Sequence, residues 1–325
     1  NSMKLTGTLV GSVRSMAKIG DDGERGGDTF VAVSDYGEIA VLVPQREDGG
    51  QAARYNTTTI FSDCKCVFRD VCTDPSGACY ALDITGKLVR RHVTTPQMAT
   101  PPLQLPQGRW EHLLRRSDGK LVAVAHDKVA WVDGKTMTVA AAVEVEDGIA
   151  EAGLLDDELL LFCNSGRMID FKGYERQASL PVTMPKGEVV TAFGYMADKG
   201  WLVLGTGTGP IYIYDRSGKL LSSLHGHTGR ITHLEPASWM LVSSSYDHTV
   251  RLWDMRDITS LVTPVNITYD RWPLCFVTDE RRHTIRVGME GGDIRSVNVS
   301  AEGNALSTQK NITRDFSSDE WEYYI

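Results

Sequence analysis

One stretch of the sequence brings together the side-chain types of a hydrolytic triad. His227, a serine at Ser243 or Ser245, and Asp247 lie within 21 residues of one another. In such a triad a histidine takes the proton of a serine, and an aspartate orients the histidine. The serine must be exposed beside an oxyanion hole, and the G-x-S-x-G turn that exposes it in many hydrolases occurs nowhere in this sequence. The pattern therefore favours a structural role over catalysis.

Four cysteines within 16 residues raise the question of a zinc site. Their spacing, C-x-C-x5-C-x6-C, lacks the pairs separated by two to four residues that structural zinc sites use. Cys72 and Cys79 also stand in apolar, strand-like runs. We therefore predict no metal and reduced, mostly buried thiols, which fits a cytoplasmic protein. The six cysteines of the chain are Cys64, Cys66, Cys72, Cys79, Cys163 and Cys275.

Glycine-rich and acidic segments offer two further kinds of ligand site. Residues 205–209 read Gly-Thr-Gly-Thr-Gly, but neither a helix nor a Walker lysine follows them, so a phosphate site is not expected. The acidic runs 144–147 and 156–158 lack the alternating oxygen ligands and final glutamate of a calcium loop. The sequence therefore predicts no cofactor.

Composition and charge exclude several classes of protein. The chain has 325 residues, of which 42% are hydrophobic and 23% are charged, as in ordinary globular proteins. The net charge of −8 disfavours a nucleic-acid binder that works by neutralising phosphates. No apolar run approaches the ~20 residues of a membrane helix, and the first residues lack the layout of a signal peptide. We therefore expect neither a nucleic-acid nor a membrane partner.

The elements that must position these residues are short strands arranged in repeats. Residues 220–254 contain four strand-like runs separated by turn residues. Repeats of one supersecondary unit bury their apolar faces against neighbouring copies, so they indicate a single ring or stack. Including the copy in 220–254, repeats of this pattern begin near residues 11, 66, 108, 147, 187, 227 and 270, at intervals of 55, 42, 39, 40, 40 and 43 residues.

The repeat in 220–254 resembles a WD40 repeat. Gly226-His227 opens it, Asp247 stands in the turn between its second and third strands, and Trp253-Asp254 closes it. WD40 repeats are ~40–45 residues long and form four strands per blade. Seven copies imply an all-β fold, a seven-bladed β-propeller of four-stranded antiparallel blades.

The resemblance also assigns roles to the residues considered first. It implies a buried structural tetrad of His227, a strand serine (Ser243 or Ser245), Asp247 and Trp253. The aspartate would hold the histidine tautomer, and the serine would satisfy the indole N–H, which needs an acceptor when it is buried.

We predict one domain over residues 1–325, because no Pro/Ser/Gly-rich linker divides the chain. The long first interval contains the polar, glycine-rich insertions 20–27 and 45–50, which we interpret as surface loops. The ring must close, and residues 1–10 resemble the outermost strand that precedes a repeat. They can complete the last blade, and residues 305–313 compete for the same position.

The C-terminal residues 316–325 are predicted to form a short helix. Ser317 and Glu320 form a capping box, and Phe316 can pack on Trp321. This ending also resembles the C-terminus of WD40 domains in large bacterial signalling proteins, where the propeller follows another module. The apolar face of the predicted helix comprises Trp321, Tyr324 and Ile325.

A rigid ring that presents strand starts and turns around a central mouth favours a recognition function. Two adjacent arginines beside a glutamate suit a charged peptide. We therefore predict a monomeric, non-enzymatic scaffold or sensor module that binds a protein or peptide partner across this face, possibly as the C-terminal part of a larger signalling protein. The alternative is a hydrolase or lyase with its site at the central mouth. The predicted mouth residues are Arg14, Arg69, Glu111, Ala150, Thr191, Thr232 and Pro273, with Tyr246 in a neighbouring turn.

Overall fold

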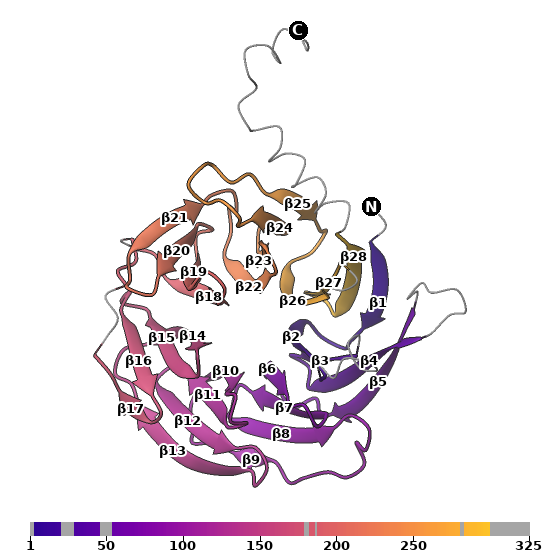
Figure 1. The fold of residues 1–325 in the computed structure, drawn as a ribbon. Coiled ribbons are helices and arrows are strands. Elements are labelled where there is room, and N and C mark those ends of the chain that lie inside the picture. Colours follow the sequence, from indigo (N-terminus) through magenta and orange to yellow (C-terminus); the bar gives the residue numbers. More distant parts are fainter. Residues whose placement is uncertain are drawn as a thin grey trace, which may run out of the picture.

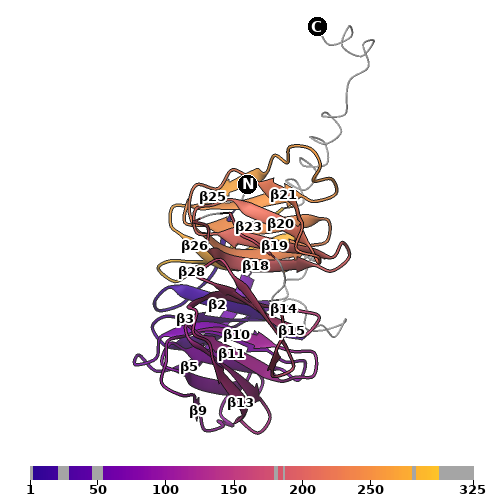
Figure 2. The ribbon, with the colours of Figure 1, turned by 90° about the vertical axis from the view of Figure 1, so that its left-hand side faces the viewer.

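Seven four-stranded antiparallel sheets form the protein (Figure 1). The computed structural model describes residues 3–20, 29–45, 54–178, 182–185, 187–279 and 283–299. The sheets stand as blades around a central axis, and Figure 2 shows the same blades from the side. The described residues contain no helix, so the predicted all-β, seven-bladed fold is confirmed for them. The helix predicted at residues 316–325 lies outside this part of the chain.

Each of the first six blades is a run of four consecutive strands, with the first strand innermost and the fourth outermost (Figure 1). Blade 1 comprises β2 (Val13–Lys18), β3 (Phe30–Ser34), β4 (Glu38–Gln45) and β5 (Arg54–Ser62). Blade 2 comprises β6 (Phe68–Thr73), β7 (Ala78–Asp83), β8 (Lys87–His92) and β9 (Leu103–Gln104). Blade 3 comprises β10 (Trp110–Arg115), β11 (Leu121–Ala125), β12 (Lys128–Asp133) and β13 (Thr138–Glu144).

The remaining blades follow the same plan, except that the last one takes its outer strand from the other end of the chain. Blade 4 comprises β14 (Ile149–Leu155), β15 (Glu158–Cys163), β16 (Met168–Lys172) and β17 (Glu175–Arg176). Blade 5 comprises β18 (Val190–Met196), β19 (Trp201–Thr206), β20 (Ile211–Asp215) and β21 (Leu220–Leu224). Blade 6 comprises β22 (Ile231–Ala237), β23 (Met240–Ser245), β24 (Thr249–Asp254) and β25 (Val265–Thr268). Blade 7 comprises β26 (Pro273–Asp279), β27 (Thr284–Met289), β28 (Asp293–Asn298) and β1 (Lys4–Thr8).

The N-terminal strand occupies the outer position of blade 7. It pairs antiparallel with β28, from Lys4 opposite Ser296 to Thr8 opposite Asp293. Leu9 follows the strand, donates its backbone N–H to the Gly292 carbonyl at 2.9 Å and is buried between blades 7 and 1. The first and last parts of the propeller therefore share one sheet. Residues 305–313, the other candidates for this position, lie outside the described residues.

The core lies between neighbouring blades. The second strands β3, β7 and β11 are buried along their whole length, because both of their faces pack against adjacent sheets. One apolar cluster joins blades 2 and 3 through Leu82 and Trp110, and another joins blades 5 and 6 through Ile213 and Trp253. This packing fixes each blade relative to the next and so positions the innermost strands around the axis.

Candidate functional site

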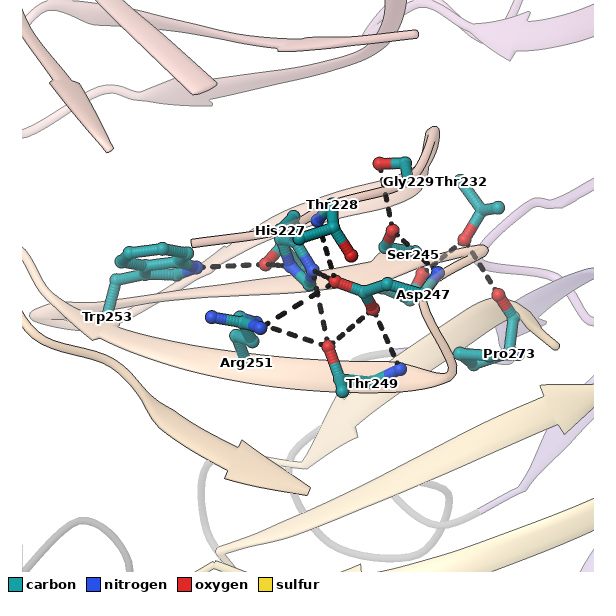
Figure 3. A network of polar contacts seen from close by, with 12 residues as sticks. His227, Thr228, Gly229, Thr232, Ser245, Asp247, Thr249, Arg251, Trp253 and Pro273 are labelled. Atoms are coloured by element: carbon teal, nitrogen blue, oxygen red, sulfur yellow. Dashed lines mark hydrogen bonds and ion pairs between the residues drawn. The ribbon is translucent and has the colours of Figure 1, made fainter. Parts of the chain in front are cut away.

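The predicted tetrad forms a continuous hydrogen-bonded chain in blade 6 (Figure 3). His227 Nδ1 lies 2.7 Å from Asp247 Oδ2, and His227 Nε2 lies 2.6 Å from Ser243 Oγ. The Trp253 indole N–H donates to the same Ser243 oxygen at 2.9 Å. Of the two candidate serines the structure brings Ser243 into this chain, whereas Ser245 donates to the Gly229 carbonyl at 3.0 Å. Ser243 and Trp253 are completely buried, so their polar groups depend on these bonds.

The Asp247 carboxylate interacts with donor groups of four other residues, which belong to blade 6 or to the connection before it. Besides His227 it accepts the Thr228 N–H at 3.1 Å and both the N–H and the hydroxyl of Thr249 at 2.9 and 2.6 Å, and Arg251 lies 3.7 Å away. Burial opposes ionisation of Asp247, but the hydrogen bonds from His227 and Thr249 outweigh it and hold its pKa well below the ordinary value. Burial lowers the pKa of His227, and the hydrogen bond to Asp247 offsets only part of this effect.

This network ties the connection before β22 to the second and third strands of its blade. A nucleophilic serine must be reached by substrate, and Ser243 is sealed beneath its neighbours. The arrangement supports stabilisation of the blade, as the resemblance implied.

The depressed pKa of Asp247 predicts how the stability of the protein depends on pH. Because the folded-state pKa lies below the unfolded value of ~4, the contribution of Asp247 is fully present above that value and is lost as the pH falls through the folded value. We expect the difference in free energy of unfolding between the wild type and Asp247→Asn to shrink as the pH falls below 4. Urea unfolding of both proteins between pH 5 and 3 measures it, and a difference that grows over this range would contradict the assignment.

A second set of residues lies at the axis, where the first strand of every blade contains a β-bulge. In all seven strands the register with the second strand shifts around the second residue, for example between Val13 and Ser15 in β2 and between Phe68 and Asp70 in β6. A bulge leaves one residue unpaired and can re-aim its side chain. The bulged residues are Arg14, Arg69, Glu111, Ala150, Thr191, Thr232 and Leu274.

These positions surround a central cavity of about 400 Å³. The mouth residues predicted from the repeats agree with the bulged positions in six blades, but in blade 7 the prediction of Pro273 is wrong by one residue. Pro273 pairs with Met289 before the bulge, and Leu274 takes the ring position. The six residues predicted for the partner-binding face all line the cavity, namely Arg14, Arg69, Glu111, Thr191, Thr232 and Tyr246.

The two threonines of this set are engaged by the fold. Thr191 Oγ1 donates to the Ile231 carbonyl at 2.7 Å, and Thr232 Oγ1 donates to the Pro273 carbonyl at 2.8 Å. Each bond joins the first strand of one blade to the first strand of the next. These hydroxyls therefore connect blades 5, 6 and 7 and contribute less to partner binding than their position suggests.

The two arginines of this set are held by neighbouring carboxylates. Arg14 lies 3.3 Å from Asp35, and the Nε of Arg69 lies 3.7 Å from Glu111, which also pairs with Arg109 at 2.6 Å. The Nε–H groups of Arg14 and Arg69 are buried and make no hydrogen bond with the described residues. The two side chains are 30% and 21% exposed, so both remain partly accessible at the mouth.

An aromatic pair beside the mouth was only partly predicted. Tyr246 stacks on Trp272 with ring centroids 4.4 Å apart and planes 23° apart. Trp272 is 38% exposed, whereas Trp110 in blade 3 is completely buried. Trp272 precedes the innermost strand of blade 7, whereas Trp110 begins its strand and packs between two blades. Sequence spacing alone did not separate these two positions.

Below the bulged residues the cavity wall carries acids and imidazoles. Asp70, His112, Glu151 and His233 stand one residue after the bulged positions and line the cavity. His112 Nδ1 lies 3.3 Å from Glu151 Oε1, and His233 Nε2 lies 3.7 Å from Glu235. None of these four residues was among the predicted mouth residues. The repeat template would have found them, since each follows a predicted mouth residue directly.

Asp70 connects three blades. Its Oδ1 accepts the Ser15 hydroxyl of blade 1 at 2.7 Å, and its Oδ2 accepts the Leu113 N–H of blade 3 at 2.7 Å. Burial raises the pKa of this carboxyl, and these donors oppose the rise. Asp70 is thus held in place as part of the wall.

The cysteines are all free thiols in the structure. Cys66, Cys79, Cys163 and Cys275 are buried, and burial raises their pKa values, to about 12 for Cys79. A raised pKa disfavours the reactive thiolate. Within the described ranges no three His, Cys, Asp or Glu side chains are placed to hold a metal ion. The described chain also contains no helix of the length and apolarity needed to cross a membrane.

A closed ring of seven four-stranded blades defines the protein as a β-propeller. The family model for the WD domain, G-beta repeat, matches residues 218–254, which contain the tetrad. The propeller superimposes on the WD40 beta propeller domain of Doa1 with a TM-score of 0.72 at 15% identity, covering 91% of this chain and 97% of that one. The chain therefore contains a WD domain, G-beta repeat in blade 6 and shares the fold of a WD40 β-propeller.

The curated relatives match over shorter stretches. The WD repeat domain-containing protein 83 homolog of Dictyostelium discoideum is 40% identical over 63 residues, 18% of this chain and 19% of that protein. The Periodic tryptophan protein 2 homolog of Mus musculus is 29% identical over 122 residues, 29% of this chain and 13% of that protein. The chain thus spans less than a quarter of the length of either relative.

Proposed function

We propose that the protein is a non-enzymatic interaction module that binds a protein or peptide partner across the mouth of the central cavity. WD40 propellers typically act as protein-interaction scaffolds. The observation that carries the proposal is the set of side chains around the mouth, where Trp272, Tyr246, Arg14, Arg69 and Arg230 gather beside the cavity. Tryptophan, tyrosine and arginine dominate the binding energy of protein interfaces.

The mouth offers a partner two kinds of contact. The Tyr246–Trp272 stack presents a rigid aromatic surface on blades 6 and 7, and such surface is ordered before binding. Arg14 and Arg69, whose side chains are 30% and 21% exposed, present guanidinium groups on blades 1 and 2 to acceptor groups of the partner. A segment lying across the mouth can reach both sets, because both border the same cavity.

The alternative is an enzyme, hydrolase or lyase, with its site in this cavity. The observation that favours it is the His112–Glu151 contact of 3.3 Å, an arrangement that general acid–base catalysts use. Within the described residues, however, no serine, threonine or cysteine side chain makes a hydrogen bond with His112. We therefore rank the enzyme second.

We also infer that the module works in the cytoplasm as part of a larger signalling protein. The support is the resemblance of residues 311–325 to the ends of WD40 domains in bacterial signalling proteins, together with the six free thiols, which suit a reducing compartment.

Affinity capture with mouth variants tests the interaction module. We expect Trp272→Ala and Arg14→Glu each to reduce recovery of the partners of the full chain at least about tenfold, the usual effect of removing a hot-spot residue. Arg216→Glu is the matched control, since Arg216 lies in the turn between β20 and β21, at the opposite end of the blades. Its partner yield should equal that of the wild type.

Equal recovery of the same proteins by the wild type and both mouth variants would contradict the proposal. Turnover of a substrate that is abolished by His112→Gln would favour the enzyme instead.

A further inference from the structure

Glu151 has an unusual position among the acidic residues of the cavity. Its side chain is only 13% exposed. Its Oε1 accepts the Ala152 N–H at 2.8 Å and faces His112 Nδ1 at 3.3 Å. In the part of the chain that the structure describes, Oε2 has no hydrogen-bond donor. One oxygen of a largely buried carboxylate therefore remains available to a ligand in the cavity.

Two of the three arginines that line the cavity are paired with other carboxylates, and the third, Arg230, forms no ion pair with the described residues. Arg14 and Arg69 at the mouth pair with Asp35 and Glu111, and no lysine or arginine of the described residues forms an ion pair with Glu151. The titratable groups close enough to Glu151 to interact with its charge are Asp70 on β6, His112 on β10 and His233 on β22. The imidazoles carry charge only when they are protonated. The cavity beneath the mouth is therefore acidic unless the histidines are charged.

Apolar side chains form a smaller part of the cavity wall between the polar groups. They are Leu113, Ala152, Ala192, Phe193 and Leu234. Gly153, two residues after Glu151, leaves the space that Phe193 fills, because a Cβ at Gly153 would lie 2.0 Å from the Phe193 ring. Lysine and arginine side chains combine an apolar stem with a cationic head. The stem can pack against the apolar residues of the wall while the head pairs with the carboxylate.

We propose that a basic side chain of the partner, lysine or arginine, enters the cavity and pairs with the Glu151 carboxylate. The proposal rests on the proposed function, because it names the residue that a partner held at the mouth inserts. The stem would pack against Phe193 and Leu234, and the head would donate to Glu151 Oε2. Asp35 and Glu111 offset part of the positive charge of Arg14 and Arg69 at the mouth, and Arg230 opposes the entry of a cation.

The proposal has a pH dependence of defined sign. Burial raises the pKa of Glu151, as it does for Asp70, so Glu151 takes up a proton at a higher pH than an exposed glutamate. A cation binds the ionised form, so its affinity is greatest above the pKa of Glu151 and falls as the pH decreases through it. Protonation of His112 and His233 adds positive charge to the wall and acts in the same direction, while Glu235 beside His233 moderates it.

Four blocked pentapeptides test the proposal on the full chain. The probes are acetyl-Gly-Ala-X-Ala-Gly-amide with arginine, lysine, norleucine or glutamate at X, titrated by NMR at pH 7.5. We expect the arginine or lysine peptide to bind at least about tenfold more tightly than the norleucine peptide, and the glutamate peptide to bind most weakly. The two basic peptides distinguish a guanidinium from an ammonium preference. Lowering the pH should reduce the advantage of the basic peptides, because Glu151 then takes up a proton.

Glu151→Gln should abolish the preference for basic peptides and leave norleucine binding unchanged. Glu175→Gln is the matched control, because Glu175 lies exposed on the outer strand of the same blade. If Glu151→Gln fails to fold, the side-chain carboxyl 13C shift of Glu151 in the wild type, followed as the arginine peptide is added, reports the same contact.

Equal binding of the basic and norleucine peptides, or a preference that does not fall as the pH is lowered, would overturn the proposal. So would the absence of binding by all four peptides. Such results leave the interaction module intact if Trp272→Ala still loses its captured partners. If Trp272→Ala kept its captured partners while the wild type clearly preferred basic peptides, the proposed interaction module would be contradicted. The cavity would then remain a binding site for cations.

Discussion

Asp247→Ala is expected to lower the free energy of unfolding by about 3 kcal/mol, because it leaves buried donors without an acceptor. The side chains of His227 and Arg251, the hydroxyl of Thr249 and the backbone N–H of Thr228 all face this carboxylate. None of these groups can turn to solvent without moving the connection before β22 or the third strand of the blade. Urea unfolding at neutral pH measures the change.

The control for this variant is Asp198→Ala, which removes an exposed aspartate from the turn between β18 and β19. Its effect should stay within about 0.5 kcal/mol, as for surface substitutions in general. If Asp247→Ala matched this control in stability, the network would not hold the blade, and a catalytic role for His227 would have to be reconsidered.

Deletion of residues 1–9 is expected to destabilise the ring by at least about 3 kcal/mol. Loss of Leu9 alone leaves a cavity between blades 7 and 1, and core deletions of leucine cost ~2–5 kcal/mol. The deletion also removes the partner of β28 from Lys4 to Thr8, which exposes a strand edge in blade 7. Exposed edges pair with other chains, so the truncated protein should also self-associate.

Deletion of residues 1 and 2 serves as the matched truncation, since it leaves β1 and Leu9 in place. Thermal unfolding measures the stability of the two truncated proteins, and light scattering measures their self-association. Comparing the two proteins separates the effect of an open ring from that of a shorter chain. Equal melting temperatures and equal monomer content would show that the outer strand of blade 7 is dispensable.

The blade count could be predicted because the repeat in blade 6 keeps every residue of its network. His227, Asp247 and Trp253 each have a hydrogen-bonding role that few other side chains fill, so their types and spacing identify the repeat. Blade 5 shows the limit of this approach. Tyr214 stands where blade 6 has tryptophan, and its hydroxyl donates to the Thr183 carbonyl at 3.0 Å, outside any tetrad. Its position was predictable from periodicity, whereas its partner depends on the path of the connection from blade 4.

The cavity illustrates a second limit. The positions Arg14, Arg69 and Glu111 follow from the repeat period, because each innermost strand reaches the axis in the same register. Their partners come from other blades or other strands, and the sequence does not encode such contacts locally. The bulge adds a further difficulty, because it turns two consecutive residues of each first strand toward the axis, whereas regular alternation predicts one. Asp70 and Glu151 were missed for this reason.

The shared sheet of the two chain ends determines when the molecule can finish folding. Thr6 and Ser296 join their hydroxyls across 290 positions of sequence, and contacts between such distant residues form slowly. Ribosomes add about 5–20 residues per second, so β1 waits on the order of tens of seconds for β28 to be made. Until then Val13 and Phe30, which pack against blade 7, have no cover. Closure of the ring is therefore a late step in the folding of the propeller, and slower translation lengthens the period in which the nascent chain depends on chaperones.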